Sequence, residues 1–241
     1  MRRFIYFLIF IISLAGCDFS KAKMPSEIKG LMGYWKFDGN AKDSGENSNH
    51  GKWVGKEFYE KGVFGQSASF DGKSYVTIPH SSSIDVGGAA FSYGGWINSI
   101  GHPKGLYQHI FNKRTGGNIG VFWDIYMYAN SEKINSEIAG QSFSDVPTEI
   151  KTLSWHHIMF TRDDTGLAIL YIDGKPIKTQ SAPGDSSNNH SFNIGSLAGY
   201  LDQSFYGSID EVVIYNRALN PSEVESLYLA GKRAIGGTKK E

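Results

Sequence analysis

Apolar and polar residues alternate along most of the chain, in short segments separated by turn-forming residues. The segments are residues 32–37, 67–70, 75–78, 91–100, 108–113, 120–128, 155–162, 167–172, 175–179, 191–195 and 206–215. A period of two is typical of β-strands. Asp71-Gly72 and Asp173-Gly174 each separate two such segments, and these pairs favour hairpin turns. The pattern predicts an all-β fold in which two antiparallel sheets pack as a sandwich.

One short helix is predicted near the C-terminus. Asn220 is a suitable N-cap, Pro221 suits the first helical position, and Glu223 completes a capping box. The apolar stripe consists of Val224, Leu227, Tyr228 and Leu229. Gly231 is expected to end the helix. Residues 232–241 show no apolar periodicity, so we expect a flexible tail there.

The first seventeen residues have a different pattern. Arg2 and Arg3 precede the apolar run 4–12. The run is shorter than the roughly 20 residues that a membrane-spanning helix needs, and it is typical of a cleaved signal segment. Leu-Ala-Gly-Cys at residues 14–17 resembles the bacterial lipobox. The alternative is an ordinary signal peptide in which the cysteine is incidental.

The lipobox resemblance implies a domain organisation and a location. Residues 1–16 would be a lipoprotein signal peptide, and Cys17 would be acylated, for example with palmitate, as the new N-terminus. Residues 17–29 are polar and would form a tether, followed by one domain over residues 30–231. The protein would then be a membrane-anchored lipoprotein of the bacterial cell envelope, facing the periplasm or the exterior.

Charge and cysteine content narrow the function classes. The chain has 24 Lys and Arg against 24 Asp and Glu, so its formal net charge is zero. This balance gives no long-range attraction for phosphates, and we expect no nucleic-acid partner. Cys17 is the only cysteine, so the domain has no internal disulfide and depends on its apolar core.

Several segments in consistent order resemble the laminin-G-like domains, which have a concanavalin A-type jelly roll. These are Gly33–Asp38, Asp43–Gly51, Ser69–Gly72, Phe91–Ile97, Trp155–Ile158, Leu170–Lys175 and Ile209–Glu211. Together they span residues 32–231. The resemblance implies a two-sheet jelly-roll sandwich whose relatives mostly bind ligands, although some hydrolases share the fold.

An enzyme is not predicted, because the sequence shows no pair of carboxylates placed to act together on one glycosidic bond. A glycoside hydrolase of this fold needs two carboxylates on the same face, flanking the bond to be cleaved. Asp210 and Glu211 are adjacent on a predicted strand, so they are expected to point to opposite faces. His156 and His157 are expected to do the same and are interpreted as packing residues. A polysaccharide-degrading enzyme remains the less favoured alternative.

Asp210 is a candidate metal ligand. Alternation places it on the face of Val212 and Ile214, where a carboxylate without a partner is costly to bury. The family resemblance implies one structural calcium ion, with Asp38 and Asp71 as further ligands. Calcium favours six to eight oxygen ligands. The alternative is that Asp210 accepts hydrogen bonds from backbone amides.

The strand at residues 121–128 is the best candidate for a binding surface. One face carries Val121, Trp123, Ile125 and Met127, and suits the core; the other carries Phe122, Asp124, Tyr126 and Tyr128. Aromatic rings beside a carboxylate suit a sugar. Trp53 and Tyr107 are expected near the rim. The sequence therefore predicts a non-catalytic module for a glycan, or alternatively for a cell-surface protein.

Overall fold

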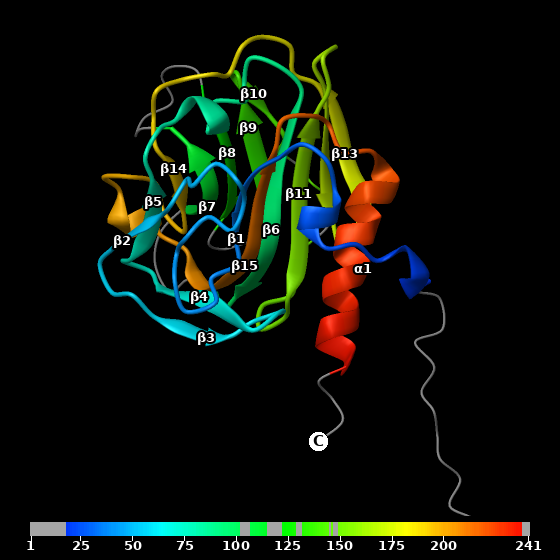
Figure 1. Ribbon diagram of the computed structural model, residues 1–241. Helices are drawn as coiled ribbons and strands as arrows, with labels where there is room; N and C mark the ends of the chain where they lie inside the picture. Colours follow the sequence, from blue (N-terminus) through cyan, green and yellow to red (C-terminus); the bar gives the residue numbers. More distant parts are fainter. Residues whose placement is uncertain are drawn as a thin grey trace, which may run out of the picture.

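Two antiparallel sheets pack face to face, with one helix outside them (Figure 1). The structure is a computed structural model that describes residues 18–101, 107–114, 122–128, 132–144, 146 and 149–237. Sheet A has the strand order β13-β12-β11-β6-β15-β4-β3, and β1 also pairs with β15. Sheet B has the order β10-β9-β8-β7-β14-β5-β2. The predicted all-β sandwich is confirmed.

The elements have the following bounds. Sheet A contains β1 (Leu31–Trp35), β3 (Tyr59–Lys61), β4 (Gln66–Asp71), β6 (Phe91–Ser99), β11 (His156–Arg162), β12 (Leu167–Ile172), β13 (Lys175–Ser181) and β15 (Tyr206–Tyr215). Sheet B contains β2 (Lys52–Val54), β5 (Tyr75–Ile78), β7 (Tyr107–Lys113), β8 (Trp123–Tyr128), β9 (Ile134–Ile138), β10 (Gln141–Ser142) and β14 (Phe192–Ile194). The helix is α1 (Pro221–Gly237), and the 3-10 turns are η1 (Phe19–Lys21), η2 (Pro25–Glu27), η3 (Ser82–Ile84) and η4 (Leu201–Gln203).

The main core lies between the two sheets and is rich in aromatic rings. Trp123 of β8 packs 4.4 Å from the ring of Tyr93 and 5.3 Å from that of Phe192, between centroids. Ile125 and Met127 of the same strand are also buried in this core. The alternation predicted for β8 is therefore confirmed from Phe122 onward, while Val121 lies outside the described residues.

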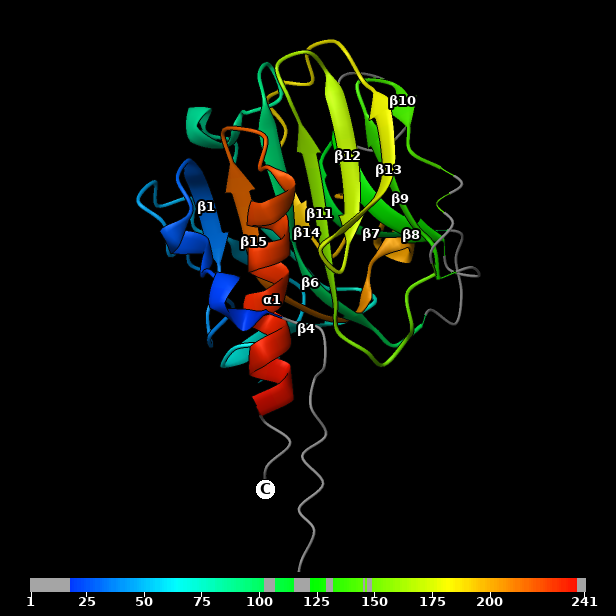
Figure 2. The same ribbon diagram turned by 90° about the vertical axis from the view of Figure 1, so that its right-hand side faces the viewer.

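A second apolar cluster lies between sheet A and α1, and Figure 2 shows α1 running along the outer face of that sheet. The helix begins as predicted: Glu223 N donates to Asn220 Oδ1 at 3.0 Å, and Asn220 N donates to Glu223 Oε2 at 3.0 Å. Its predicted end is wrong, because α1 continues past Gly231 to Gly237. A Cβ on Gly231 would lie 2.3 Å from the ring of Trp96, so this glycine permits close packing of helix on sheet.

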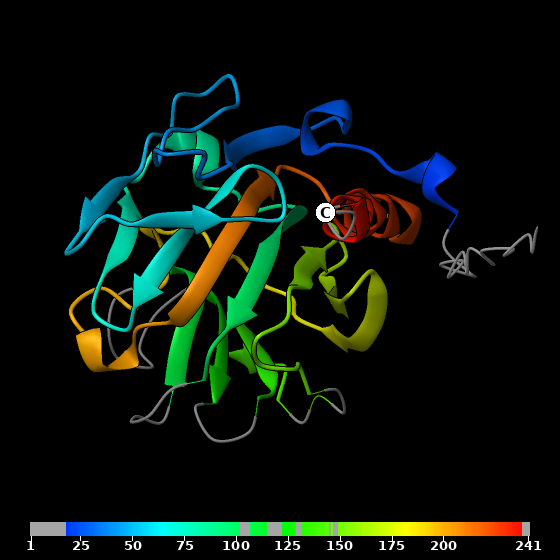
Figure 3. The same cartoon turned by 90° about the horizontal axis from the view of Figure 1, so that it is seen from below.

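The segment predicted as a tether is packed against the domain where the structure describes it. Tyr215 Oη donates to Pro25 O at 3.0 Å, and Ile28 belongs to the second apolar cluster. Figure 3, seen from below, shows the N-terminal segment in blue near α1. Cys17 and the predicted signal peptide lie outside the described residues. Among the helices described, none is long and apolar enough to cross a membrane.

Strand β15 contains a bulge that corrects one prediction. Its first half pairs with β4 and its second half with β1, and the register shifts between Asp210 and Val213. Glu211 has φ of 53°, which allows the extra residue. Asp210 pairs with Trp96, which contacts α1, and Glu211 accepts from Tyr34 Oη in the second cluster. Both carboxylates thus lie on the outer face of sheet A, not on opposite faces.

Candidate binding groove on sheet B

A groove of about 480 Å³ lies over the outer face of sheet B. The strands β7 to β10 form its floor and one wall, and the segment around η4 forms the other. His109 of β7 bridges to Ser204, which places the η4 segment beside this strand (Figure 2). The lining residues are Tyr107, His109, Arg114, Tyr126, Tyr128, Glu137, Ser142, Ser144, Leu197, Tyr200 and Gln203.

Three predicted binding residues form one aromatic cluster in this groove. Tyr107 of β7 pairs directly with Tyr128 of β8, and their ring centroids lie 5.3 Å apart. Tyr126 lies 5.6 Å from Tyr107 and 5.9 Å from Tyr128, with nearly perpendicular rings in both pairs. Tyr126 is only 6 % exposed, and Tyr107 and Tyr128 are half-buried. The two half-buried rings are the ones a ligand can reach.

Asp124 lies beneath the groove as the centre of a charged cluster. It is fully buried, and its Oδ2 lies 2.8 Å from His109 Nδ1 and 3.1 Å from Arg114 Nη1. The same Nη1 lies 3.3 Å from Oε2 of Glu137, which is opposite Asp124 on β9. The guanidinium of Arg114 also lies 3.9 Å from the centre of the Phe122 ring. Asp124 therefore orients groups that line the groove and does not itself line it.

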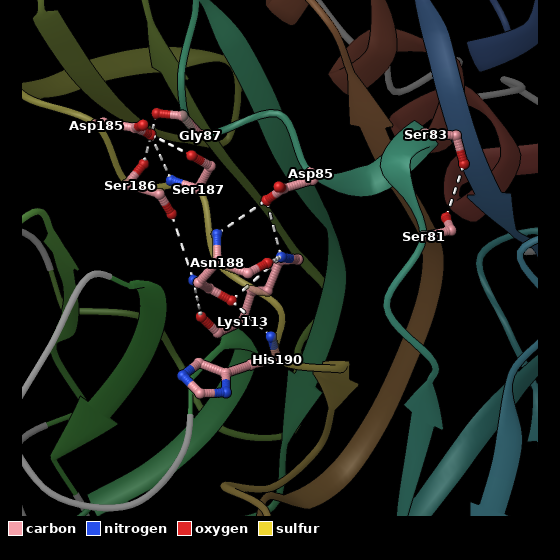
Figure 4. A network of polar contacts seen from close by, with 10 residues as sticks. All are labelled: Ser81, Ser83, Asp85, Gly87, Lys113, Asp185, Ser186, Ser187, Asn188 and His190. Atoms are coloured by element: carbon pink, nitrogen blue, oxygen red, sulfur yellow. Dashed lines mark hydrogen bonds and ion pairs between the residues drawn. The ribbon is translucent and has the colours of Figure 1, made fainter.

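Lys113 fixes the end of β7 that carries Arg114. Its side chain is fully buried, and its ammonium donates to Asp85 Oδ1 at 3.0 Å and to Asn188 Oδ1 at 3.1 Å. Burial lowers the pKa of this lysine. Figure 4 shows the ammonium among oxygens from two loops. This contact joins β7 to both loops and so fixes the place where Arg114 leaves the strand.

Trp53 is not brought to this groove. It lies on β2, the edge strand of sheet B farthest from β10. Its Nε1 donates to Tyr59 Oη at 2.8 Å, and its ring lies 5.2 Å from that of Phe70. Trp53 is partly buried against the main core. Its position gives it a packing role at the opposite edge of the sheet.

The predicted calcium ligands do not meet at one point. Asp71 accepts from Lys73 N and Ser74 N within its own turn, at the end of β4 far from Gln66. Asp38 accepts from Gln66 N at 2.8 Å. In the described part of the chain no three His, Cys, Asp or Glu side chains form a group that could hold a metal ion.

Asp210 itself is surrounded by hydrogen-bond donors. It accepts from the backbone amides of Val63 at 2.8 Å, Phe64 at 3.2 Å and Glu211 at 2.8 Å. Amide protons carry partial positive charge, so this cradle favours an anion and opposes a cation. These residues do not fit the proposed calcium ion, and the alternative of amide hydrogen bonds describes Asp210 correctly.

Asp210 and Glu211 share a face, but they are covered. Burial and the neighbouring Glu211 raise the pKa of Asp210 to about 8, and burial raises that of Glu211 to about 7. The cavity beside Glu211 measures only about 10 Å³ and is lined by Trp96, Leu227 and other covering residues. That space holds at most about one water molecule, far less than a sugar requires. The pair is inaccessible to a polysaccharide.

The two predicted histidines pack within sheet A. His157 is buried against Trp96, and its burial lowers its pKa to about 4. His156 Nδ1 lies 2.9 Å from Asp173 Oδ2 in the following hairpin. Their interpretation as packing residues agrees with these contacts.

Several groove residues were missed in the sequence. Glu137 was missed because β9 was not predicted as a strand: Asn135, Ser136 and Glu137 stand in a row between Ile134 and Ile138, so the segment has no clear alternation. His109 and Arg114 lie on a predicted strand and just after it, but a bulge at Ile110 shifts the faces of β7. Alternation alone does not show such a shift.

The comparisons with known proteins agree with this fold. A sequence profile of the concanavalin A-like lectin/glucanases superfamily matches residues 70–225, more than half of the chain. No curated protein sequence gives a significant match.

Solved structures with the same fold include binding domains and enzymes. Domain 4 of an extracellular arabinanase from Geobacillus stearothermophilus, in complex with arabinotriose, has a TM-score of 0.59 and 22 % identity, covering 82 % of this chain and 98 % of that one. The binding domain of Paraclostridial Mosquitocidal Protein 1 has a TM-score of 0.65 and 22 % identity, covering 83 % and 52 %. Trypanosoma rangeli sialidase with sialic acid has a TM-score of 0.66 and 16 % identity, covering 86 % and 34 %. This chain thus spans about half of the toxin domain and a third of the sialidase.

Proposed function

The chain belongs to the concanavalin A-like lectin/glucanase superfamily, and we propose that it is a carbohydrate-binding module whose ligand lies in the groove on sheet B. The observation that carries the proposal is the cluster of Tyr107, Tyr126 and Tyr128 beside acidic and hydroxyl side chains. Tyrosine rings stack on the C–H faces of sugars, and carboxylate and hydroxyl oxygens accept hydrogen bonds from sugar hydroxyls.

The size of the groove supports a short oligosaccharide. Ligand sites for small molecules typically measure about 300–1,000 Å³, and this groove has about 480 Å³. Its floor is built on paired strands, so the tyrosines are held in fixed positions before any ligand arrives. The arabinanase domain, which resembles this chain over nearly its whole length, is described in complex with arabinotriose.

One observation favours the enzyme alternative and limits it at the same time. Asp124 and Glu137 face each other across β8 and β9, as a pair of catalytic carboxylates would. However, Arg114 Nη1 lies between them, at 3.1 and 3.3 Å. Asp124 is also fully buried. The guanidinium occupies the place where a glycosidic oxygen would have to lie, so we propose binding without hydrolysis.

We also propose that the module is a lipoprotein of the bacterial cell envelope, anchored through Cys17. The support is the lipobox-like residues 14–17 after a short apolar run. The anchored form should partition into detergent on phase separation, because acyl chains add about 0.8 kcal/mol per buried methylene. A Cys17→Ser variant should stay in the aqueous phase. Equal partitioning of both proteins would contradict the anchor.

The binding proposal is tested with the purified protein on a glycan array, followed by titration calorimetry. A Tyr107→Ala/Tyr128→Ala variant should lose the retained glycans, because it removes both accessible rings. The matched control is Phe58→Ala, which removes an exposed aromatic ring outside the groove. Full glycan binding by the folded double variant would contradict the groove. Release of shorter sugars from a retained polysaccharide would support the hydrolase instead.

A further inference from the structure

The charged side chains in the groove indicate which class of saccharide it binds. Arg114 lines the groove with a guanidinium group. Its Nη1 contacts two carboxylates, on Asp124 and Glu137, at 3.1 and 3.3 Å. The arginine is 4 % exposed, and its guanidinium also lies against the Phe122 ring. It is therefore held by its neighbours before any ligand binds.

Among the described residues, the charged groups that contact Arg114 do not add up to a net positive charge, whether or not His109 is counted as a cation. With a neutral His109, two carboxylates oppose one guanidinium; with a charged His109, the cluster is neutral. Beyond this cluster, Lys178 donates to Ser144 O at the edge, and Asp202 lies in η4 on the opposite wall. An anionic sugar thus meets no net positive charge among the described residues of the groove.

Among the described residues that line the groove, Glu137 is the carboxylate that a ligand meets. Its side chain is 22 % exposed, whereas that of Asp124 is fully buried beneath Arg114 and His109. Glu137 lines the groove on the same face as the tyrosines. A sugar hydroxyl can donate to this carboxylate, but a sugar carboxylate would be repelled by it.

We propose that Glu137 makes the groove selective for uncharged saccharides, by balancing the charge of Arg114 and by repelling sugars that carry a carboxylate. This inference rests on the proposed carbohydrate-binding function. Glu137 acts here as a specificity-determining residue, which accepts neutral sugars through their hydroxyl groups and rejects uronic and sialic acids.

The test compares matched neutral and acidic probes on the wild-type protein and on Glu137→Gln. The probes are an array of neutral oligosaccharides with their uronic and sialylated counterparts, including arabinotriose, and lactose against 3′-sialyllactose. Glutamine has the shape of glutamate and can still accept a hydrogen bond from a sugar hydroxyl, but it removes one negative charge from the groove. Glu225→Gln, on the exposed face of α1, is the matched control for loss of one charge.

The expected results are specific to this inference. The wild-type protein and Glu225→Gln should bind neutral probes at least about tenfold more tightly than acidic ones. The affinity of Glu137→Gln for the acidic probes should be at least about tenfold higher than that of the wild-type protein. Wild-type binding to acidic probes as tight as to neutral ones would overturn the inference and leave the binding module intact. The inference would also be overturned if Glu137→Gln bound neutral probes but showed no increase in affinity for acidic probes. Binding of no saccharide by any of the proteins would overturn both proposals.

Discussion

The outer faces of the two sheets carry similar residues but differ in access. Each has aromatic rings and two neighbouring carboxylates: Asp210 and Glu211 on sheet A, Asp124 and Glu137 on sheet B. On sheet A the helix α1 and the N-terminal segment cover the pair, whose partners are backbone amides and Tyr34. On sheet B the partners are Arg114 and His109, and a groove remains open above them. The two faces therefore differ in whether other segments cover them, and not in the types of residue that they carry: the covered face of sheet A is structural, and the open face of sheet B is the candidate binding face.

The largest expected effect comes from removing one aromatic side chain on each face. Trp96→Ala on the covered face should cost about 3–5 kcal/mol in unfolding free energy, because it leaves a cavity between sheet A and α1. The ring is 3 % exposed and stacks 5.8 Å from Tyr228. Tyr128→Ala on the open face should cost about 1 kcal/mol or less in stability, while weakening glycan binding. Urea unfolding measures the loss of stability in each variant. Equal losses in Trp96→Ala and Tyr128→Ala would contradict the distinction between the faces.

A smaller effect is expected from adding one methyl group under the helix. In Gly231→Ala, the new Cβ would lie 2.3 Å from the ring of Trp96, which packs against Tyr228 and His157. Overpacking of this kind costs about 1–3 kcal/mol. Gly237→Ala is the control, since a Cβ there meets nothing within 4 Å. Thermal melts should show a lower Tm only for the first variant; an unchanged Tm would mean that α1 packs less closely than described.

The covered carboxylates predict a loss of stability as the pH rises. Because the folded chain raises the pKa of Asp210 to about 8 and of Glu211 to about 7, it keeps protons that the unfolded chain has already released. Folding is therefore favoured at low pH and weakened as the pH rises through these values. Buried His157, with a pKa of about 4, acts in the opposite direction below its ordinary pKa of 6.5. The effect of the two carboxylates on stability is therefore best measured between pH 6.5 and 9, where His157 does not oppose it.

Across that window we expect the unfolding free energy to fall by about 2 kcal/mol, as an order of magnitude. Glu211→Gln should reduce the slope, since Gln can still accept from Tyr34 Oη and no longer ionises. Glu137→Gln, which removes a carboxylate on the open face, is the matched control. Urea unfolding at intervals of half a pH unit measures it. Stability that is constant or rises over this range would contradict the burial of the pair.

The sequence predicted the layers of the fold better than the faces of its irregular strands. Regular alternation identified β8, with Trp123 and Ile125 inward and Tyr126 and Tyr128 outward. Bulges in β7 and β15 then shifted the faces of residues such as Asp210, because an extra residue inverts the alternation that follows. Glycine at 231 was interpreted as a helix end, yet its role depends on Trp96, which is distant in sequence. Such features follow from tertiary contacts that local patterns do not contain.

The groove was only partly predictable for the same reason. Asp124, Tyr126 and Tyr128 come from one predicted strand, so alternation was enough to place them on its outer face, although Asp124 lies beneath the groove and does not line it. Tyr107 was expected near a loop at the rim, and it lies at the start of β7 beside Tyr128. Glu137 lies on a strand with serine and asparagine between its two isoleucines, and these polar residues weaken the strand pattern. Trp53 was placed near the groove, but the order of strands in sheet B puts β14 and β5 between β2 and β7.

The smallest effect is expected from metal removal, on either face. On sheet A the amides of Val63 and Phe64 already donate to Asp210, and on sheet B Arg114 lies between Asp124 and Glu137. In both places a calcium ion would have to displace donors or a guanidinium. A site with a Kd of about 10 μM would add about 2.7 kcal/mol of stability in 1 mM calcium. We therefore expect the Tm in 1 mM calcium to match that in excess EDTA within about 1 °C. A calcium-dependent rise of several degrees that survives in Asp210→Asn would reveal a site other than Asp210, whereas one lost in that variant would show that the amide cradle opens to a cation.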